Sequence, residues 1–90
     1  MMARVTIEDD AVAIALSALG WTLADDARAS RLLALTGLEP EDIRARIGEP
    51  AMLGAILAFL ASHQPDLIAC AEAIGVTPQQ LIDAQARMGG

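Results

Sequence analysis

The four prolines of this 90-residue chain each stand where a helix can begin. Pro40, Pro50 and Pro78 follow within three residues of a glycine, and Pro65 follows a short polar break. Glycine just past a helix end and proline at the first helical position are the stop and start signals of consecutive helices. The spacing therefore predicts an all-α chain that forms a compact orthogonal bundle of five or six short helices.

The predicted helix boundaries follow from these signals and from capping residues. We expect helices over residues 7–23, from Asp25 or Asp26 to Thr36, from Pro40 to near Ile47, from Pro50, from Pro65 to Ile74, and from Pro78. Thr6 with Asp9, and Thr77 with Gln80, have the spacing of a capping box, in which each side chain bonds the backbone N–H of the other residue. One domain should span residues 1–90, with residues 1–5 and 88–90 frayed.

The apolar spacing within these segments predicts which residues form the core. The expected stripe on the first helix consists of Val12, Leu16, Leu19 and Leu23, widened by Ile14, Ala18 and Trp21. Later segments add Ala29, Leu32, Leu33, Leu35, Leu53, Ile56, Leu57, Leu60, Leu67, Ile68, Ala71 and Ile74. We interpret Gly20, inside the first helix, as a point of close packing.

The charge balance bears on the possible partners. Twelve carboxylates oppose six cations, all of them arginine, and the net charge of −6 repels polyanions. Nucleic acid and anionic membrane surfaces are therefore disfavoured. The longest uncharged runs, 11–24 and 50–65, fall short of the roughly 20 apolar residues that span a bilayer. We expect no membrane association.

The cysteine content and the first residues bear on location. The single cysteine, Cys70, cannot form an internal disulfide, and the start MMARVTIEDD lacks the basic-then-apolar order of a secretory signal. A cytoplasmic protein is expected.

One helix surface is predicted to be a contact surface. No charged residue occurs between Pro50 and Pro65, although a solvated helix face normally carries charges. Small residues beside the core-facing stripe permit close backbone approach, and they are Ala51, Gly54, Ala55 and Ala58. We expect this surface to contact an unknown protein partner or a second copy in a homodimer. The alternative is a central helix that other helices surround on all sides.

The acidic residues have a structural explanation. Most of the carboxylates lie within a turn of a predicted helix start, where they cap free N–H groups and complement the helix dipole. This accounts for Glu39, Glu41 and Asp42 without a role as catalytic acids or cation ligands.

One further group of residues resembles a metal or thiol site. His63, Asp66 and Cys70 lie at i, i+3 and i+7, and they would share a helix face only if the helix extended back to His63. A lone cysteine usually acts as a small hydrophobic residue. We expect no catalytic residue, no cofactor, no metal and no enzymatic activity.

Residues 67–85 match the helix-turn-helix pattern of DNA-binding proteins. Ala71, Gly75 and Leu81 satisfy the packing of two helices at a corner, whatever that corner binds. The second helix offers Gln79 and Gln80, which could read adenine, but the chain has no lysine to neutralise phosphates. An acidic helix-turn-helix DNA-binding regulator is therefore the alternative function.

A resemblance to a known family rests on three strings, LSALGWTLADD, LLALTGLEPEDIRAR and EPAMLGAILAFLASH. They resemble a small bacterial family catalogued as domain of unknown function 3572, and LTGLEPEDIR is the most specific block. The resemblance covers about residues 8–74 and is loosest from Val76 onward. It implies a single all-helical cytoplasmic domain and brings no catalytic or binding residues. Together, these observations favour a non-enzymatic protein-interaction module.

Overall fold

The computed structural model describes residues 7–88, and over this range the chain is all-α, as predicted. The helices are α1 (Ile7–Leu23), α2 (Asp26–Thr36), α3 (Pro40–Ala45), α4 (Pro50–Ala61), α5 (Gln64–Ile74) and α6 (Pro78–Arg87). The capping box predicted at the start of α1 lies outside the described part, since it needs Thr6.

Local sequence signals set most helix ends. A proline occupies the first turn of α3, α4, α5 and α6, as predicted. Asp25 caps α2, because its Oδ2 accepts a hydrogen bond from the backbone N–H of Arg28 at 3.0 Å. Gly37 and Gly75 end α2 and α5 with φ of 73° and 82°, a left-handed conformation that glycine adopts without the steric cost of a Cβ.

Two boundaries differ from the prediction by one or two residues. Helix α3 ends at Ala45 rather than near Ile47, because the backbone leaves the helical conformation at Arg46, where φ is −118°. Helix α5 begins at Gln64, one residue before the proline.

The start of α6 is a full capping box. Thr77 Oγ1 accepts a hydrogen bond from the backbone N–H of Gln80 at 3.1 Å, and Gln80 Oε1 accepts one from the backbone N–H of Thr77 at 2.8 Å. Thr77→Ala removes the hydroxyl and is expected to lower the free energy of unfolding by about 1 kcal/mol. Urea unfolding followed by circular dichroism measures this loss. Thr77→Ser keeps the hydroxyl and should retain the wild-type midpoint; an equal loss in both variants would show that the cap is not the cause.

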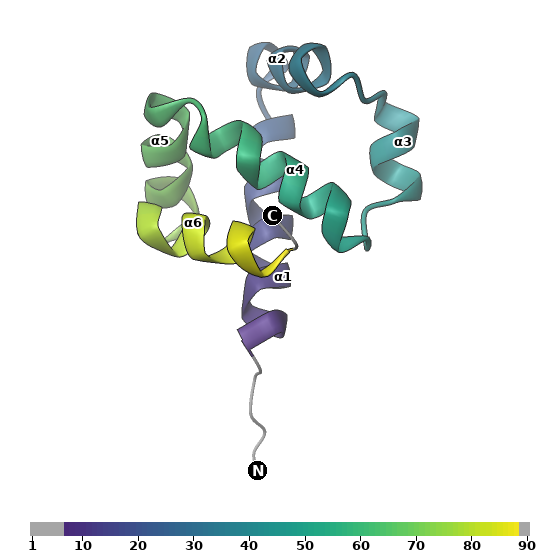
Figure 1. The fold of residues 1–90 in the computed structure, drawn as a ribbon. Helices are drawn as coiled ribbons and strands as arrows, with labels where there is room; N and C mark the ends of the chain where they lie inside the picture. Colours follow the sequence, from purple (N-terminus) through teal and green to yellow (C-terminus); the bar gives the residue numbers. More distant parts are fainter. Residues whose placement is uncertain (1–6, 89–90) are drawn as a thin grey trace.

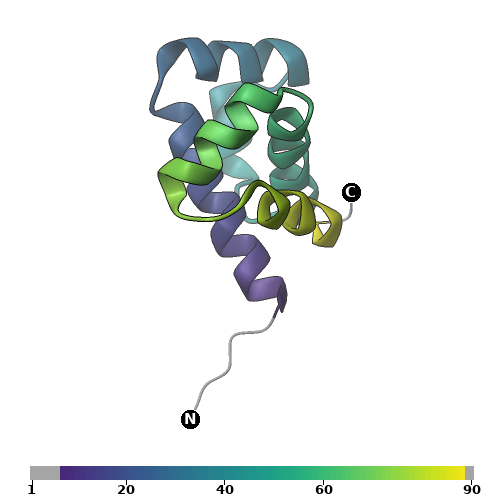
Figure 2. The same cartoon turned by 90° about the vertical axis from the view of Figure 1, so that its left-hand side faces the viewer.

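Helices α1 and α4 cross at the centre of the bundle, and α6 packs against both (Figure 1). Helix α5 lies across α1 (Figure 2). Helix α4 is buried on most of its surface through Met52, Leu53, Gly54, Ile56, Leu57, Phe59 and Leu60. Helix α3 packs least against the other helices, and its one buried residue is Ile43. The core therefore centres on α4, with α3 at the edge.

Helix α1 buries only part of the predicted stripe. Ala18 and Leu19 are buried as predicted, and Val12, Ile14 and Trp21 are partly buried against the core. Leu16 and Leu23, which we expected in the core, are each 41% exposed, and Ala11, Ala15 and Thr22 are buried as well. Residues 11–24 are apolar on nearly all sides, so their periodicity does not select one face. The face that carries the alanines is buried, because small side chains let α4, α5 and α6 approach α1 closely.

Three further expectations are wrong. Leu35 and Ile68 are exposed, by 70% and 47%. Gly20 is not a point of close packing, because a Cβ placed there would meet nothing within 4 Å. Met88 is not frayed but buried, with 4% of its surface exposed, because it packs over Gly54 of α4.

Over residues 7–88, no single helix is long and apolar enough to cross a membrane. Helices α4 and α5 reach that length and composition only as a pair, and they are bent by 115° at their junction.

Candidate functional site

The structure divides the small-residue surface predicted on α4. Gly54 is buried, and a Cβ there would lie 3.1 Å from the backbone oxygen of Met88 and 3.2 Å from its Cβ. The expectation that Gly54 contacts a partner is therefore corrected, because the glycine admits α6 of the same chain. Ala51 is exposed, and Ala55 and Ala58 are half-buried.

Ala55 and Ala58 line a shallow hollow on the surface. It has a volume of about 370 Å³, and its other lining residues are Leu35, Thr36, Phe59 and Ser62. Exposed Ala51 and this hollow are the parts of the predicted contact surface that lie on the described surface.

The possible metal or thiol group does not form a site. The side chain of His63 is half exposed, and its Nε2 lies 3.9 Å from Asp66 Oδ2. Asp66 is instead bonded to Arg31 of α2, and Cys70 is fully buried. No group of three histidine, cysteine or acidic side chains among the described residues could hold a metal ion.

Burial sets the chemistry of Cys70. Burial raises the pKa of this thiol from 9.0 to about 11, with a smaller lowering by Arg28 and a smaller raising by Asp66. The thiol is therefore neutral at physiological pH, whereas a reactive cysteine needs its thiolate.

The raised pKa predicts a loss of stability at alkaline pH. Below pH 9 the thiol of Cys70 is neutral in both the folded and the unfolded chain. Between pH 9 and about 11 the unfolded chain loses its proton first, so the free energy of unfolding should fall as pH rises. Urea midpoints at about pH 8 and about pH 10.5 measure this fall.

The composition makes this titration simple to assign. The chain has no lysine and no tyrosine, so no other side chain has its ordinary pKa in that range. Cys70→Ala should keep the fold and show no such fall. The same alkaline loss in Cys70→Ala would assign it to another group.

The helix-turn-helix corner is present between α5 and α6. The backbone N–H groups of Gly75 and Val76 both donate to the carbonyl of Ala71, at 3.0 and 2.9 Å. The side chains proposed to read bases are engaged within α6 itself. Gln79 donates to Asp83 Oδ1 at 3.0 Å, and Gln80 completes the capping box.

Some acidic side chains bond to helix starts, as expected, and others pair with arginines, which the sequence did not predict. Asp42 accepts a hydrogen bond from the backbone N–H of Glu39 at 3.0 Å. Glu49 pairs with Arg46 at 3.1 Å. These carboxylates stabilise α3 and its connection to α4.

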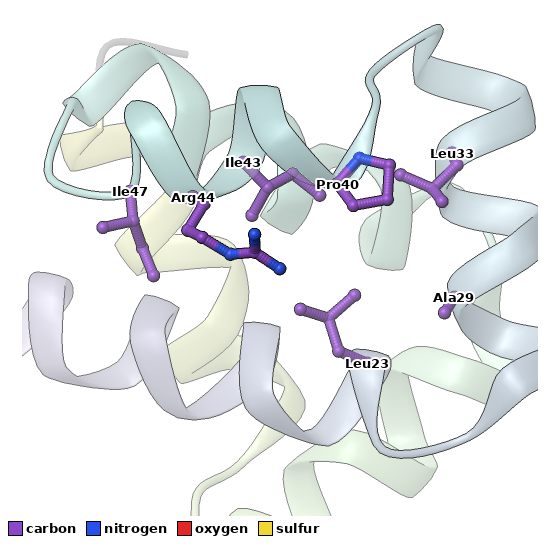
Figure 3. A pocket seen from close by; sticks show the side chains of 7 residues that line it. All are labelled: Leu23, Ala29, Leu33, Pro40, Ile43, Arg44 and Ile47. Atoms are coloured by element: carbon purple, nitrogen blue, oxygen red, sulfur yellow. The ribbon is translucent and has the colours of Figure 1, made fainter.

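An apolar groove, which the sequence analysis did not predict, lies between the end of α1, α2 and α3 (Figure 3). Its volume is about 310 Å³, and it is lined by Leu23, Ala29, Leu33, Pro40, Ile43, Arg44 and Ile47. We call these residues the α1–α2–α3 groove. Leu23 and Ile47 are 41% and 43% exposed, so the groove opens to the surface.

Two contacts form the groove walls. Arg28 of α2 donates from its guanidinium to the carbonyl of Trp21 at 2.6 Å and lies 3.6 Å over the centre of the indole ring, which ties α2 to the end of α1. Ile43 anchors α3 in the core, and Pro40 of α3 and Ile47 after its end line the groove opposite Leu23 and Leu33 (Figure 3).

A sequence signal for this groove was present. Pro40, Ile43 and Ile47 lie at i, i+3 and i+7, an apolar stripe that extends past the end of the short α3. The predicted helix ends near Ile47, so the prediction did not include Ile47 in a binding surface.

Comparisons with known proteins place the chain in a family and go no further. No curated protein and no solved structure matches it. One family model matches residues 8–90, so the similarity includes the region after Val76 where the resemblance was loosest. The chain therefore belongs to the family described as Protein of unknown function (DUF3572).

Proposed function

We propose that this protein is a non-enzymatic protein-interaction module that binds its partner in the α1–α2–α3 groove. The observation that carries the proposal is an open, almost entirely apolar groove of about 310 Å³, flanked by exposed Leu23 and Ile47. Exposed apolar surface that is hollowed marks binding sites more often than scattered apolar residues do. We place the protein in the cytoplasm.

The proposed occupant is an aliphatic or aromatic side chain on a segment of another protein. A second copy of this chain is less suitable, because Leu35, the most exposed large apolar side chain among residues 11–88, does not line the groove. A copy that inserted Leu35 would dock head to tail, and such contacts build open chains unless they close into a ring. A different protein as the partner would not build such open chains.

DNA binding is not favoured by any feature of the described residues. The α6 glutamines are hydrogen-bonded within the helix or its cap, and the net charge of −6 opposes the approach of a polyanion.

The test is partner capture from the native cell with matched variants. Ile47→Glu places a charge in the groove, and Ile68→Glu places one at a residue of α5 with almost the same exposure, 47% against 43%. Both side chains are partly exposed, so circular dichroism should show folded proteins. Mass spectrometry should identify proteins that are captured by wild type and by Ile68→Glu but not by Ile47→Glu. These proteins should bind the wild type again when each is tested in purified form.

Two other results would contradict the proposal. Equal binding of the same proteins by all three chains would place the partner surface elsewhere. Concentration-dependent dimers of the wild type that Ile47→Glu dissociates would assign the groove to a second copy. Sedimentation velocity distinguishes this outcome.

A further inference from the structure

The α1–α2–α3 groove contains one charged group, the guanidinium of Arg44. Figure 3 shows it directed into the space between Ile43 and Leu23. Among residues 11–88, whose side chains the structure describes, no carboxylate lies within ion-pairing distance of Arg44. Arg44 is solvent-exposed, and its guanidinium lies beside the apolar residues of the groove without a counter-charge from this part of the chain.

Several neighbouring charged residues are engaged elsewhere. Arg46, two residues later, pairs with Glu49 at 3.1 Å. The carboxylate of Asp42 accepts a hydrogen bond from the backbone N–H of Glu39. Arg28 and Arg31 bond to Trp21 and Asp66. The local network thus leaves the guanidinium that overlooks the groove available to a ligand.

We propose that the groove selects a partner segment in which a carboxylate lies beside an apolar anchor residue. This inference rests on the proposed function and specifies its ligand. The apolar side chain would fill the space between Leu23, Leu33 and Ile43, and the Asp, Glu or C-terminal carboxylate would accept hydrogen bonds from Arg44. A planar guanidinium binds carboxylates in a two-point geometry. Because Arg44 is solvent-exposed, the pair would form at the edge of the groove.

The apolar anchor and the carboxylate of the partner segment contribute to binding in different ways. The apolar anchor supplies most of the affinity, because it removes apolar surface from water. The carboxylate supplies selectivity, since a partly exposed pair contributes about a two- to fivefold change in affinity. Losing the charge should therefore relax the choice of partner without abolishing binding.

The experiment is selection of a random 16-residue peptide display library on the full chain. Wild type should enrich peptides with Asp or Glu within about four residues of Leu, Ile, Met or Phe. Arg44→Gln should enrich the same apolar anchors without the acidic preference. Arg44→Glu should favour Lys or Arg at that position, and Ile47→Glu should enrich neither. Fluorescence anisotropy on one selected peptide should show about two- to fivefold weaker binding to Arg44→Gln.

The outcomes separate the two proposals. Apolar motifs without an acidic preference on wild type, or an acidic preference that persists in Arg44→Gln, would overturn the role of Arg44 and leave the groove as an interaction site. Enrichment that Ile47→Glu does not alter, or no enriched motif on wild type, would overturn the proposed function as well.

Discussion

Replacing Gly54 with glutamate is expected to unfold the protein or to lower its free energy of unfolding by more than about 3 kcal/mol. A Cβ at this position would already meet the backbone oxygen of Met88 at 3.1 Å. The rest of the side chain has no space, and its carboxylate would be buried without a partner. Since a domain of this size has about 5–15 kcal/mol of stability, the loss is a large part of the total. Urea unfolding followed by circular dichroism measures it.

Gly20→Glu is the matched control for this prediction. Gly20 is also a helical glycine, but it is exposed, and a Cβ there would meet nothing within 4 Å. Glutamate has a higher helix propensity than glycine, so this variant should be as stable as wild type or more stable by about 0.5 kcal/mol. A folded, monomeric Gly54→Glu protein would contradict the packing of α6 on α4 and would restore the predicted contact surface at Gly54.

Leu32→Ala is expected to lower the free energy of unfolding by about 2–5 kcal/mol. Leu32 is fully buried, and it is the one core residue of α2. Truncation removes buried methyl groups and leaves a cavity that rigid neighbours fill only in part. Because α2 also forms a wall of the α1–α2–α3 groove, the variant should weaken partner binding. The urea midpoint gives the loss of stability.

Leu35→Ala makes the same chemical change one turn later on the same helix. Leu35 is 70% exposed, so its truncation should change the free energy of unfolding by less than about 0.5 kcal/mol. Similar losses for both variants would mean that α2 is rotated about its axis relative to the structure described here.

The two candidate surfaces differ in how far the sequence predicted them. The absence of charged residues on α4 indicated a helix with little solvated surface. That pattern is compatible with a contact surface and with a core helix that other helices surround. Gly54 is buried under Met88 and belongs to the core, whereas Ala51 is exposed and Ala55 and Ala58 are half-buried at the surface. The groove was not predicted, because its walls come from residues 23–47 on three separate helices, and their meeting depends on how those helices pack.

The sequence by itself determined the number, order and approximate ends of the helices in the described range. Pro40, Pro50, Gly75 and the Thr77 cap act through bonds and steric limits within a single turn, so their effect does not depend on distant contacts. Periodicity also predicted the buried stripe of α4, where Leu53, Ile56, Leu57 and Leu60 are buried. Only the tertiary structure decided which residues of α1 are buried most deeply, because this helix is apolar on most sides and its periodicity gives no preferred direction. The choice then depends on how closely neighbouring helices can approach, which placed the alanines of α1 in the core and left Leu23 at the edge of the groove.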